Sequence, residues 1–245
     1  MRIRKAKGNQ AVVEPGIFGL VYRKVAPSVI LVFEADYMHK LVALCGYADT
    51  PRKMANLRYY EPPQKGLPGI AGPAVGAPQA TIALEVLIAC GVERVLGFGV
   101  CGSIDPEATI GKWFVPAWAL AEEGTSGHYF PGETEFAPDE QFRAELEGAL
   151  SGAGHEFLGG GVWTTDAIFR ETADKVTGYQ ARGMRCVEME MSALCAVAKF
   201  RAVRYAALMV VSDELFTMRW KPGFRMPGLK KSMAAAMEFL KDHRF

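Results

Sequence analysis

Short apolar runs of strand length alternate with helical periodicity along most of this chain, and this alternation constrains the fold most strongly. Residues 29–33 and 205–211 predict buried strands, and residues 94–99 predict a strand that leads into a glycine-rich turn. Helical periodicity is found over residues 36–44, 79–90, 139–150, 189–200 and 228–241. Strands that alternate with helices predict a mostly parallel sheet with helices on both faces.

The segments between these runs show no break between domains. Residues 51–78 are rich in Pro and Gly, which predicts loops and short strands, and residues 112–121 mix strand and turn character. No stretch has the composition of a linker. We therefore expect residues 1–245 to form a single α/β domain, for which 245 residues are a suitable length.

Charge and cysteine content exclude several classes of protein. Lys and Arg number 28 against 27 Asp and Glu, and a net charge of +1 gives no reason to expect a nucleic-acid or membrane-surface partner. Five cysteines without a CxxC pair, and four scattered histidines, show no metal-ligand spacing. We expect reduced thiols in a cytoplasmic protein. The first ten residues are basic but no apolar segment follows them, so we expect no signal peptide.

A glycine-rich segment follows the strand predicted at residues 94–99. Residues 97–103 read Gly-Phe-Gly-Val-Cys-Gly-Ser. Glycines allow a ligand to approach the backbone, and successive N–H groups can bind an anion. The segment lacks the GK[ST] of a phosphate-binding loop and the third glycine of a dinucleotide site. A tight turn without ligand remains an equally simple interpretation.

Two carboxylates stand at the predicted start of a helix, in the segment Cys-Val-Glu-Met-Glu-Met-Ser at residues 186–192. Alternation along an extended chain places Glu188 and Glu190 on the same side. A carboxylate accepts two hydrogen bonds side by side, which suits the two hydroxyls of a ribose. The alternative is that both acids favour the positive end of the helix dipole.

A third candidate is Asp213, at which an apolar strand ends. The carboxyl end of a strand is where an open α/β sheet places its catalytic groups. The alternative is a helix N-cap formed by Ser212 or Asp213. Two further polar segments, residues 122–129 and 163–170, each resemble ordinary loops when taken alone.

Taken in order, these segments resemble the nucleoside phosphorylase family, in the branch of uridine phosphorylase and bacterial purine nucleoside phosphorylase. The resemblance covers about residues 66–215. It rests on Val-Gly-Ala-Pro-Gln-Ala at 75–80, Gly-Val-Cys-Gly-Ser at 99–103, Glu-Gly-Thr-Ser with His-Tyr at 123–129, Thr-Asp at 165–166, Val-Glu-Met-Glu at 187–190 and Val-Ser-Asp at 211–213.

The resemblance implies a single α/β domain with a mixed, partly barrel-like central sheet flanked by helices. It implies cleavage of the N-glycosidic bond of a nucleoside by a pentosyltransferase without a cofactor. Glu190 would bind the 2′- and 3′-hydroxyls and stabilise the positive charge that develops on the sugar. Met189 would pack against the sugar, and Glu188 would support the hydroxyl network.

For the base, the resemblance implies a pocket that includes Thr164, Thr165, Asp166 and Phe169. Asp213 matches the aspartate that protonates N7 in purine-specific members, which makes the base a better leaving group. Uridine phosphorylases use a glutamine and an arginine after the position of Phe169. Residues 170–174 of this chain contain no glutamine, which favours a purine over a pyrimidine. Arg219 or Arg225 could polarise Asp213.

The acceptor region, Gly99, Val100, Cys101 and Gly102, departs from the family pattern. Val100 stands where the family has a phosphate-binding threonine. Glu34 replaces a glycine of the family's phosphate-binding segment, and Met38 falls near the arginine of that segment. Gly97 stands where the family has a second arginine.

Losing two arginines weakens a site for a dianion, and Glu34 adds repulsion. Three outcomes stay open: phosphate held by other cations (Lys40, Arg52, Arg58 or the cluster around Arg219 and Arg225), hydrolysis by water, or a binding protein without catalysis. The family also implies a homo-oligomer, dimer or hexamer.

Overall fold

The computed structural model describes residues 7–8 and 11–244. Most of the first ten residues, on which the expectation about a signal peptide rests, lie outside the described residues. The strands are β1 (Ser28–Val32), β2 (Arg52–Met54), β3 (Leu57–Tyr60), β4 (Gly69–Gly72), β5 (Arg94–Ser103), β6 (Trp113–Ala121), β7 (Glu135–Phe136), β8 (Phe157–Thr164), β9 (Met184–Glu188), β10 (Arg204–Glu214) and β11 (Lys221–Pro222). The helices are α1 (Gly16–Val21), α2 (Ala35–Leu44), α3 (Ala77–Ala89), α4 (Ser126–Tyr129), α5 (Glu140–Gly152), the 3₁₀ turn η1 (Ile168–Arg170), α6 (Ala173–Ala181), α7 (Met191–Arg201) and α8 (Pro227–Asp242).

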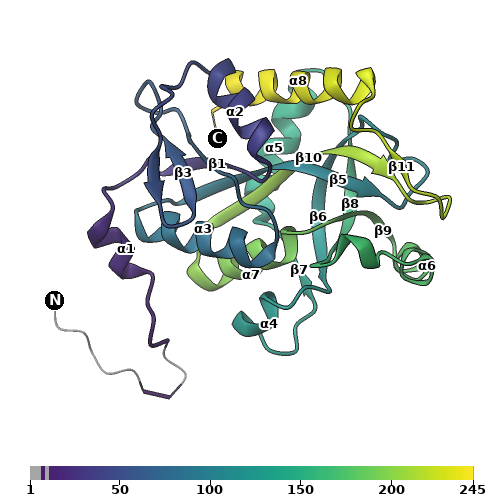
Figure 1. Ribbon diagram of the computed structural model, residues 1–245, viewed down its shortest axis with the longest axis horizontal. Helices are drawn as coiled ribbons and strands as arrows, with labels where there is room; N and C mark the ends of the chain where they lie inside the picture. The colour runs from purple at the N-terminus through teal and green to yellow at the C-terminus, as the bar shows by residue number, and fades with distance from the viewer. Residues whose placement is uncertain (1–6, 9–10, 245) are drawn as a thin grey trace.

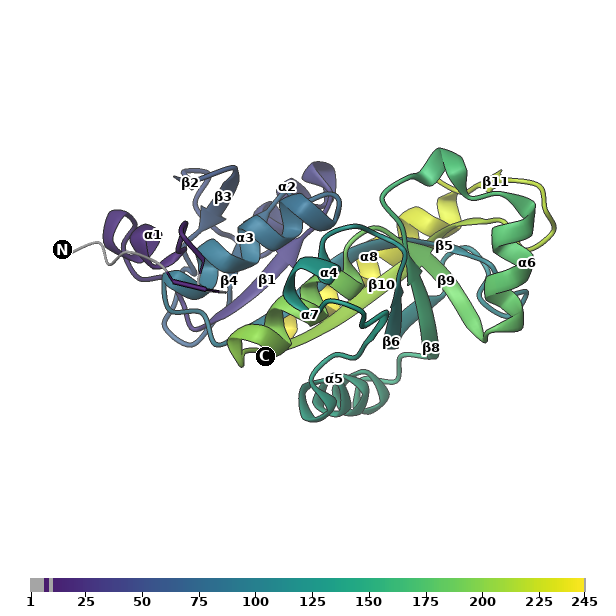
Figure 2. The ribbon, with the colours of Figure 1, turned by 90° about the horizontal axis from the view of Figure 1, so that it is seen from below.

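All these strands belong to one mixed sheet, part of which closes into a barrel. Its order is β11-β10-β6-β8-β9-β5-β1-β4-β3-β2, and β10 also pairs with β5 along its length. This extra pairing joins β5, β10, β6, β8 and β9 in a ring, while β1 to β4 extend it as an open sheet (Figure 2). The mixed, partly barrel-like sheet implied by the resemblance is thus confirmed, whereas a mostly parallel sheet is not.

Helices cover both faces of the sheet, as expected. Helices α2, α5 and α8 pack on one face and α3 and α7 on the other (Figure 1). Alternate residues of β10 divide between the two cores: Tyr205, Ala207 and Met209 face α3 and α7, and Ala206, Leu208 and Val210 face α5 and α8. The two-residue period of a strand produces this division.

Most elements expected from the sequence are confirmed to within two residues. The helix expected at 189–200 begins at Met191 because the chain stays extended through Glu188. Strand β8 and helix α6 had not been predicted. Three successive glycines interrupt the strand pattern of β8, Phe-Leu-Gly-Gly-Gly-Val-Trp-Thr, since glycine has low strand propensity.

The glycine-rich segment 97–103 is not a turn, which corrects the sequence-based expectation. It is the second half of β5. A Cβ at Gly97 would lie 2.5 Å from the Tyr205 hydroxyl oxygen and 3.0 Å from the Phe33 ring, and a Cβ at Gly99 would lie 2.5 Å from that ring. These glycines therefore allow large buried side chains to cross the strand closely.

The cysteines and the lengths of the helices bear on two other expectations. All five cysteines are free thiols, and four of them are buried. No helix within the described residues is long and apolar enough to cross a membrane.

Candidate functional site

A cavity of about 410 Å³ opens where several strands reach their carboxyl ends. Its walls come from Glu34 at the start of α2, the ends of β5, β9 and β10, the turn around η1, and the segment that includes β11. Five carboxylic acids line it: Glu34, Glu171, Glu188, Glu190 and Asp213. The rest of the wall is mainly apolar and aromatic, as in a site that buries a small organic ligand.

Glu188 connects strand β9 to helix α7. One carboxylate oxygen accepts the backbone N–H groups of Glu190 (2.6 Å) and Met191 (2.7 Å), and the other accepts the Thr164 hydroxyl. The side chain thus binds N–H groups at the start of α7, which have no partner within the helix. Glu188 reaches the cavity wall, but its oxygens are already engaged. This arrangement fits the expected supporting role beside the hydroxyl-binding residue.

Glu190 is the N-cap residue of α7 and is buried at the cavity wall. One oxygen accepts the backbone N–H of Gly76, just before α3. The contact holds the carboxylate at the junction of two helices. The helix interpretation holds for Glu188, which accepts N–H groups at the start of α7. Glu190 lines the cavity beside Met189, and its binding of ribose hydroxyls stays a prediction.

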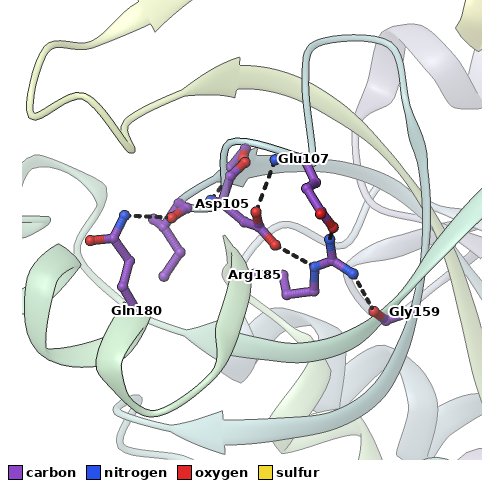
Figure 3. Close-up of polar contacts among 7 residues, drawn as sticks. Asp105, Glu107, Gly159, Gln180 and Arg185 are labelled. Atoms are coloured by element: carbon purple, nitrogen blue, oxygen red, sulfur yellow. Dashed lines mark hydrogen bonds and ion pairs between the residues drawn. The ribbon is translucent and has the colours of Figure 1, made fainter.

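An ion-pair network holds β9 in place (Figure 3). The Arg185 guanidinium donates to Asp105, to Glu107 at 2.6 Å and to the Gly159 carbonyl at 3.3 Å. These partners lie after β5 and within β8, the two strands that flank β9. The network therefore fixes the strand that carries Glu188, three residues further along the chain.

Asp213 lines the cavity near the end of β10, where this strand pairs with both β5 and β11. Its two oxygens accept from the Ser212 hydroxyl (2.6 Å) and from the indole N–H of Trp220 (2.8 Å). Trp220, rather than Arg219 or Arg225, contacts this carboxylate. The N-cap alternative is wrong, because β10 continues to Glu214.

The residues expected around the base are only partly brought together. Phe169, which is 92 % exposed, lines the cavity together with Asp213. Thr164 and Thr165 are buried behind the wall, where the Thr164 hydroxyl bonds to Glu188. Asp166 faces away and accepts the Gly124 N–H.

Val100, Cys101 and Gly102 of the expected acceptor region line the cavity, and Glu34 lies beside them. One Glu34 oxygen accepts the Val100 N–H at 3.3 Å, while the other is buried and bonds to none of the described residues. Buried side chains fill the space at the two positions where the family has arginines. Met38 is fully buried in the core, and Tyr205 and Phe33 occupy the space beside Gly97.

No lysine, arginine or histidine among residues 7–8 and 11–244 lines the cavity. The cations considered from the sequence are placed elsewhere. Arg52 pairs with Glu61, Arg58 contacts His39, and Lys40 lies over the Tyr37 ring. In the same described ranges, no group of three or more acidic, histidine or cysteine side chains is arranged to hold a metal ion.

Burial raises the pKa of glutamates that line the cavity. Burial raises the pKa of Glu34 to about 7. Burial, followed by the charges of Asp213 and Glu122, raises the pKa of Glu171 to about 7. Burial raises the pKa of Glu190 as well, and neighbouring Glu188 adds to it. Desolvation disfavours a charged carboxylate, and neighbouring negative charge adds to that effect.

Sequence reasoning gave no site role to several residues of the wall, among them Glu171, Trp220 and Phe224. Trp220 and Phe224 lie beside Arg219 and Arg225, the two basic residues that the sequence suggested for this region. Glu171 lies in the stretch 170–174, whose lack of a glutamine was the feature that favoured a purine. An aromatic pair between basic residues was the available signal for the first two.

The chain was compared with known proteins. The profile of the phosphorylase superfamily matches residues 29–234. Guanosine phosphorylase of Halorubrum lacusprofundi is 32 % identical over 146 residues, which cover 60 % of this chain and 61 % of that protein. A DeoD-type purine nucleoside phosphorylase of Bacillus cytotoxicus is 29 % identical over 151 residues, covering 60 % and 64 %. The matches thus span less than two thirds of these relatives.

Two solved structures share the fold. Purine nucleoside phosphorylase from Toxoplasma gondii, in complex with immucillin-H, has a TM-score of 0.79 at 19 % identity, covering 89 % of this chain and 90 % of that one. AMP nucleosidase from Bacteroides thetaiotaomicron has a TM-score of 0.69 at 21 % identity, covering 89 % and 88 %.

Proposed function

This chain belongs to the phosphorylase superfamily, and from that premise we propose that it cleaves the N-glycosidic bond of a purine nucleoside. One observation carries the proposal: a single cavity holds Glu190, buried at one end, and Asp213 among aromatic side chains at the other. A sugar hydroxyl pair suits the first carboxylate, and a heterocyclic base suits the aromatic end. The purine names of the two relatives support the same choice of base.

In this proposal Glu190 binds the 2′- and 3′-hydroxyls, Met189 packs on the sugar, and Glu188 holds Glu190 and the start of α7 in position. Negative charge beside the sugar stabilises the oxocarbenium-like transition state. Phe169, Trp220 and the other aromatic residues cover the base. The main acceptor that the family implies is phosphate, with transfer of the pentose to it.

Hydrolysis is the second candidate, and the Glu34 carboxylate favours it. The acceptor end carries acids, and no cation from the described residues, to meet a phosphate dianion. Glu34 presents a buried oxygen without a partner among those residues, and a carboxylate with a pKa near 7 suits a general base that takes a proton from water.

The test incubates the purified protein with inosine, guanosine, adenosine, methylthioadenosine and uridine, with and without phosphate, and measures the free base. Release that requires phosphate supports the phosphorylase, and equal release without it supports the nucleosidase. Binding without any release would identify a non-catalytic nucleoside-binding protein. Glu190→Ala should lose nucleoside binding, and full activity in this variant would contradict the ribose assignment.

We also propose that the protein forms a homo-oligomer in the cytoplasm. Apolar side chains are exposed along α1 and beside it, at Ile17, Leu20, Val21, Ile82 and Phe200. A second copy of the chain would cover such a surface, and free thiols suit a reducing compartment. Light scattering after gel filtration measures the mass, and a monomer at micromolar concentration would contradict the first part.

A further inference from the structure

Two carboxyl groups meet at the base end of the cavity. Asp213 comes from the end of β10, and Glu171 comes from the short segment between η1 and α6. They are far apart in the sequence, but each carboxyl lies within electrostatic reach of the other. When two acids share a site, their environments decide which of them holds a proton.

Neighbouring side chains occupy both carboxylate oxygens of Asp213. Each oxygen already accepts a hydrogen bond, from the Ser212 hydroxyl on one side and the Trp220 indole on the other. The indole N–H can only donate. The Ser212 hydroxyl has a single proton and also lies 3.2 Å from the Cys101 carbonyl oxygen. Protein groups therefore engage both Asp213 oxygens before a base binds.

Glu171 has the opposite surroundings. No hydrogen bond from the described residues reaches its carboxyl group, which is partly buried in the cavity wall. Three charged groups face it from three elements: Asp213 on β10, Glu122 at the end of β6 and Lys175 on α6. Lys175 forms an ion pair with Glu122, so these two charges largely compensate each other. Burial and the charge of Asp213 together favour a neutral Glu171 near pH 7.

We propose that Glu171 is the proton donor to the leaving purine, and that Asp213, beside it and already engaged by Ser212 and Trp220, positions that proton. The inference rests on the proposed function. As the bond between C1′ and N9 breaks, its electron pair stays with the base, and the Glu171 hydroxyl proton moves to N7. The base leaves neutral, the sugar cation is captured by water or phosphate, and Glu171 regains a proton from solvent. Asp213 is then a positioning residue for that proton rather than its source.

The test measures kcat/KM against pH for inosine, in the wild type and in Glu171→Gln. We expect Glu171→Gln to lose at least about 100-fold at pH 6, within the usual contribution of a general acid. The wild-type rate should fall above pH 7, and the residual rate of the variant should lack that part of the fall. Asp213→Asn should move the fall to lower pH, because it removes the negative charge beside Glu171. Asp174→Asn, at an exposed position in the first turn of α6, is the matched control and should keep the wild-type profile.

A second substrate separates a chemical role from a structural one. 4-Nitrophenyl riboside has a leaving group that needs no proton, so Glu171→Gln should cleave it at nearly the wild-type rate. Comparing two substrates in one variant also cancels the titration of the acids at the sugar end, Glu34 and Glu190.

If Glu171→Gln keeps the fall above pH 7 and Asp213→Asn abolishes it, Asp213 is the donor and the inference is wrong. If Glu171→Gln loses both substrates equally, the role is structural and the inference is again wrong. A wild type that cleaves no purine nucleoside would instead overturn the proposed function, and the inference with it.

Discussion

Replacement of Glu34 by glutamine should stabilise the protein at alkaline pH. Glu34 places one carboxylate oxygen against buried atoms without a hydrogen-bond partner among the described residues, and the Val100 N–H at 3.3 Å is the partner of the other. Burying a charge without a partner costs free energy. Glutamine has nearly the same shape and carries no charge, so the variant removes the cost and keeps the packing.

The expected size follows from the pKa of Glu34. In the unfolded chain a glutamate loses its proton near pH 4.5, whereas burial raises the pKa of folded Glu34 to about 7. The folded state therefore binds more protons between these values, and the stability of the wild type falls as pH rises from about 4.5 to about 7. Above pH 7 the accumulated cost is roughly 1–3 kcal/mol, from 1.4 kcal/mol per pH unit reduced for cavity water.

Urea denaturation at pH 5 and pH 8 measures this difference. Glu34→Gln and wild type should have nearly the same free energy of unfolding at pH 5, and the variant should be more stable by roughly 1–3 kcal/mol at pH 8. The negative charge of Glu34 also raises the pKa of Glu190, so its removal adds to the gain expected at pH 8. Glu93→Gln, at an exposed glutamate, is the control and should show no such gain. An equal difference at the two pH values, or a less stable variant at pH 8, would refute the reasoning.

Three further outcomes are expected. Glu188→Ala should lose about 2–4 kcal/mol in urea denaturation, since two backbone N–H groups and a hydroxyl lose their acceptor; an unchanged midpoint would contradict the role of Glu188. Gly97→Ala should lose about 1–3 kcal/mol because its Cβ would lie 2.5 Å from the Tyr205 hydroxyl, whereas Gly148→Ala, with nothing within 4 Å, should be neutral or stabilising. Trp220→Phe removes the hydrogen bond from the indole to Asp213 and should lower kcat about tenfold. Tm should stay unchanged, because the Trp220 side chain is 63 % exposed. A large fall in Tm would show a structural role.

The sequence by itself determined the order and type of most elements. The apolar run that became β1 and the periodicity that became α5, with Asp139 as its N-cap, are local signals. Local patterns report which face of an element is buried, because that depends on the strand or helix period. The ordered motifs also placed Glu190 and Asp213 together in one cavity.

Only the tertiary structure decided how distant elements meet. The pairing of β10 with β5 closes the barrel, and the same pairing brings Tyr205 over Gly97 and fills the position of a missing arginine. The base end likewise depends on contacts through space, where Trp220 meets Asp213 and Glu171 shares their cavity. A carboxyl group's protonation depends on its burial and on charges from other elements. Burial and the charges of other elements are not encoded in the period of a local pattern, so only the folded chain determines the chemistry of these acids.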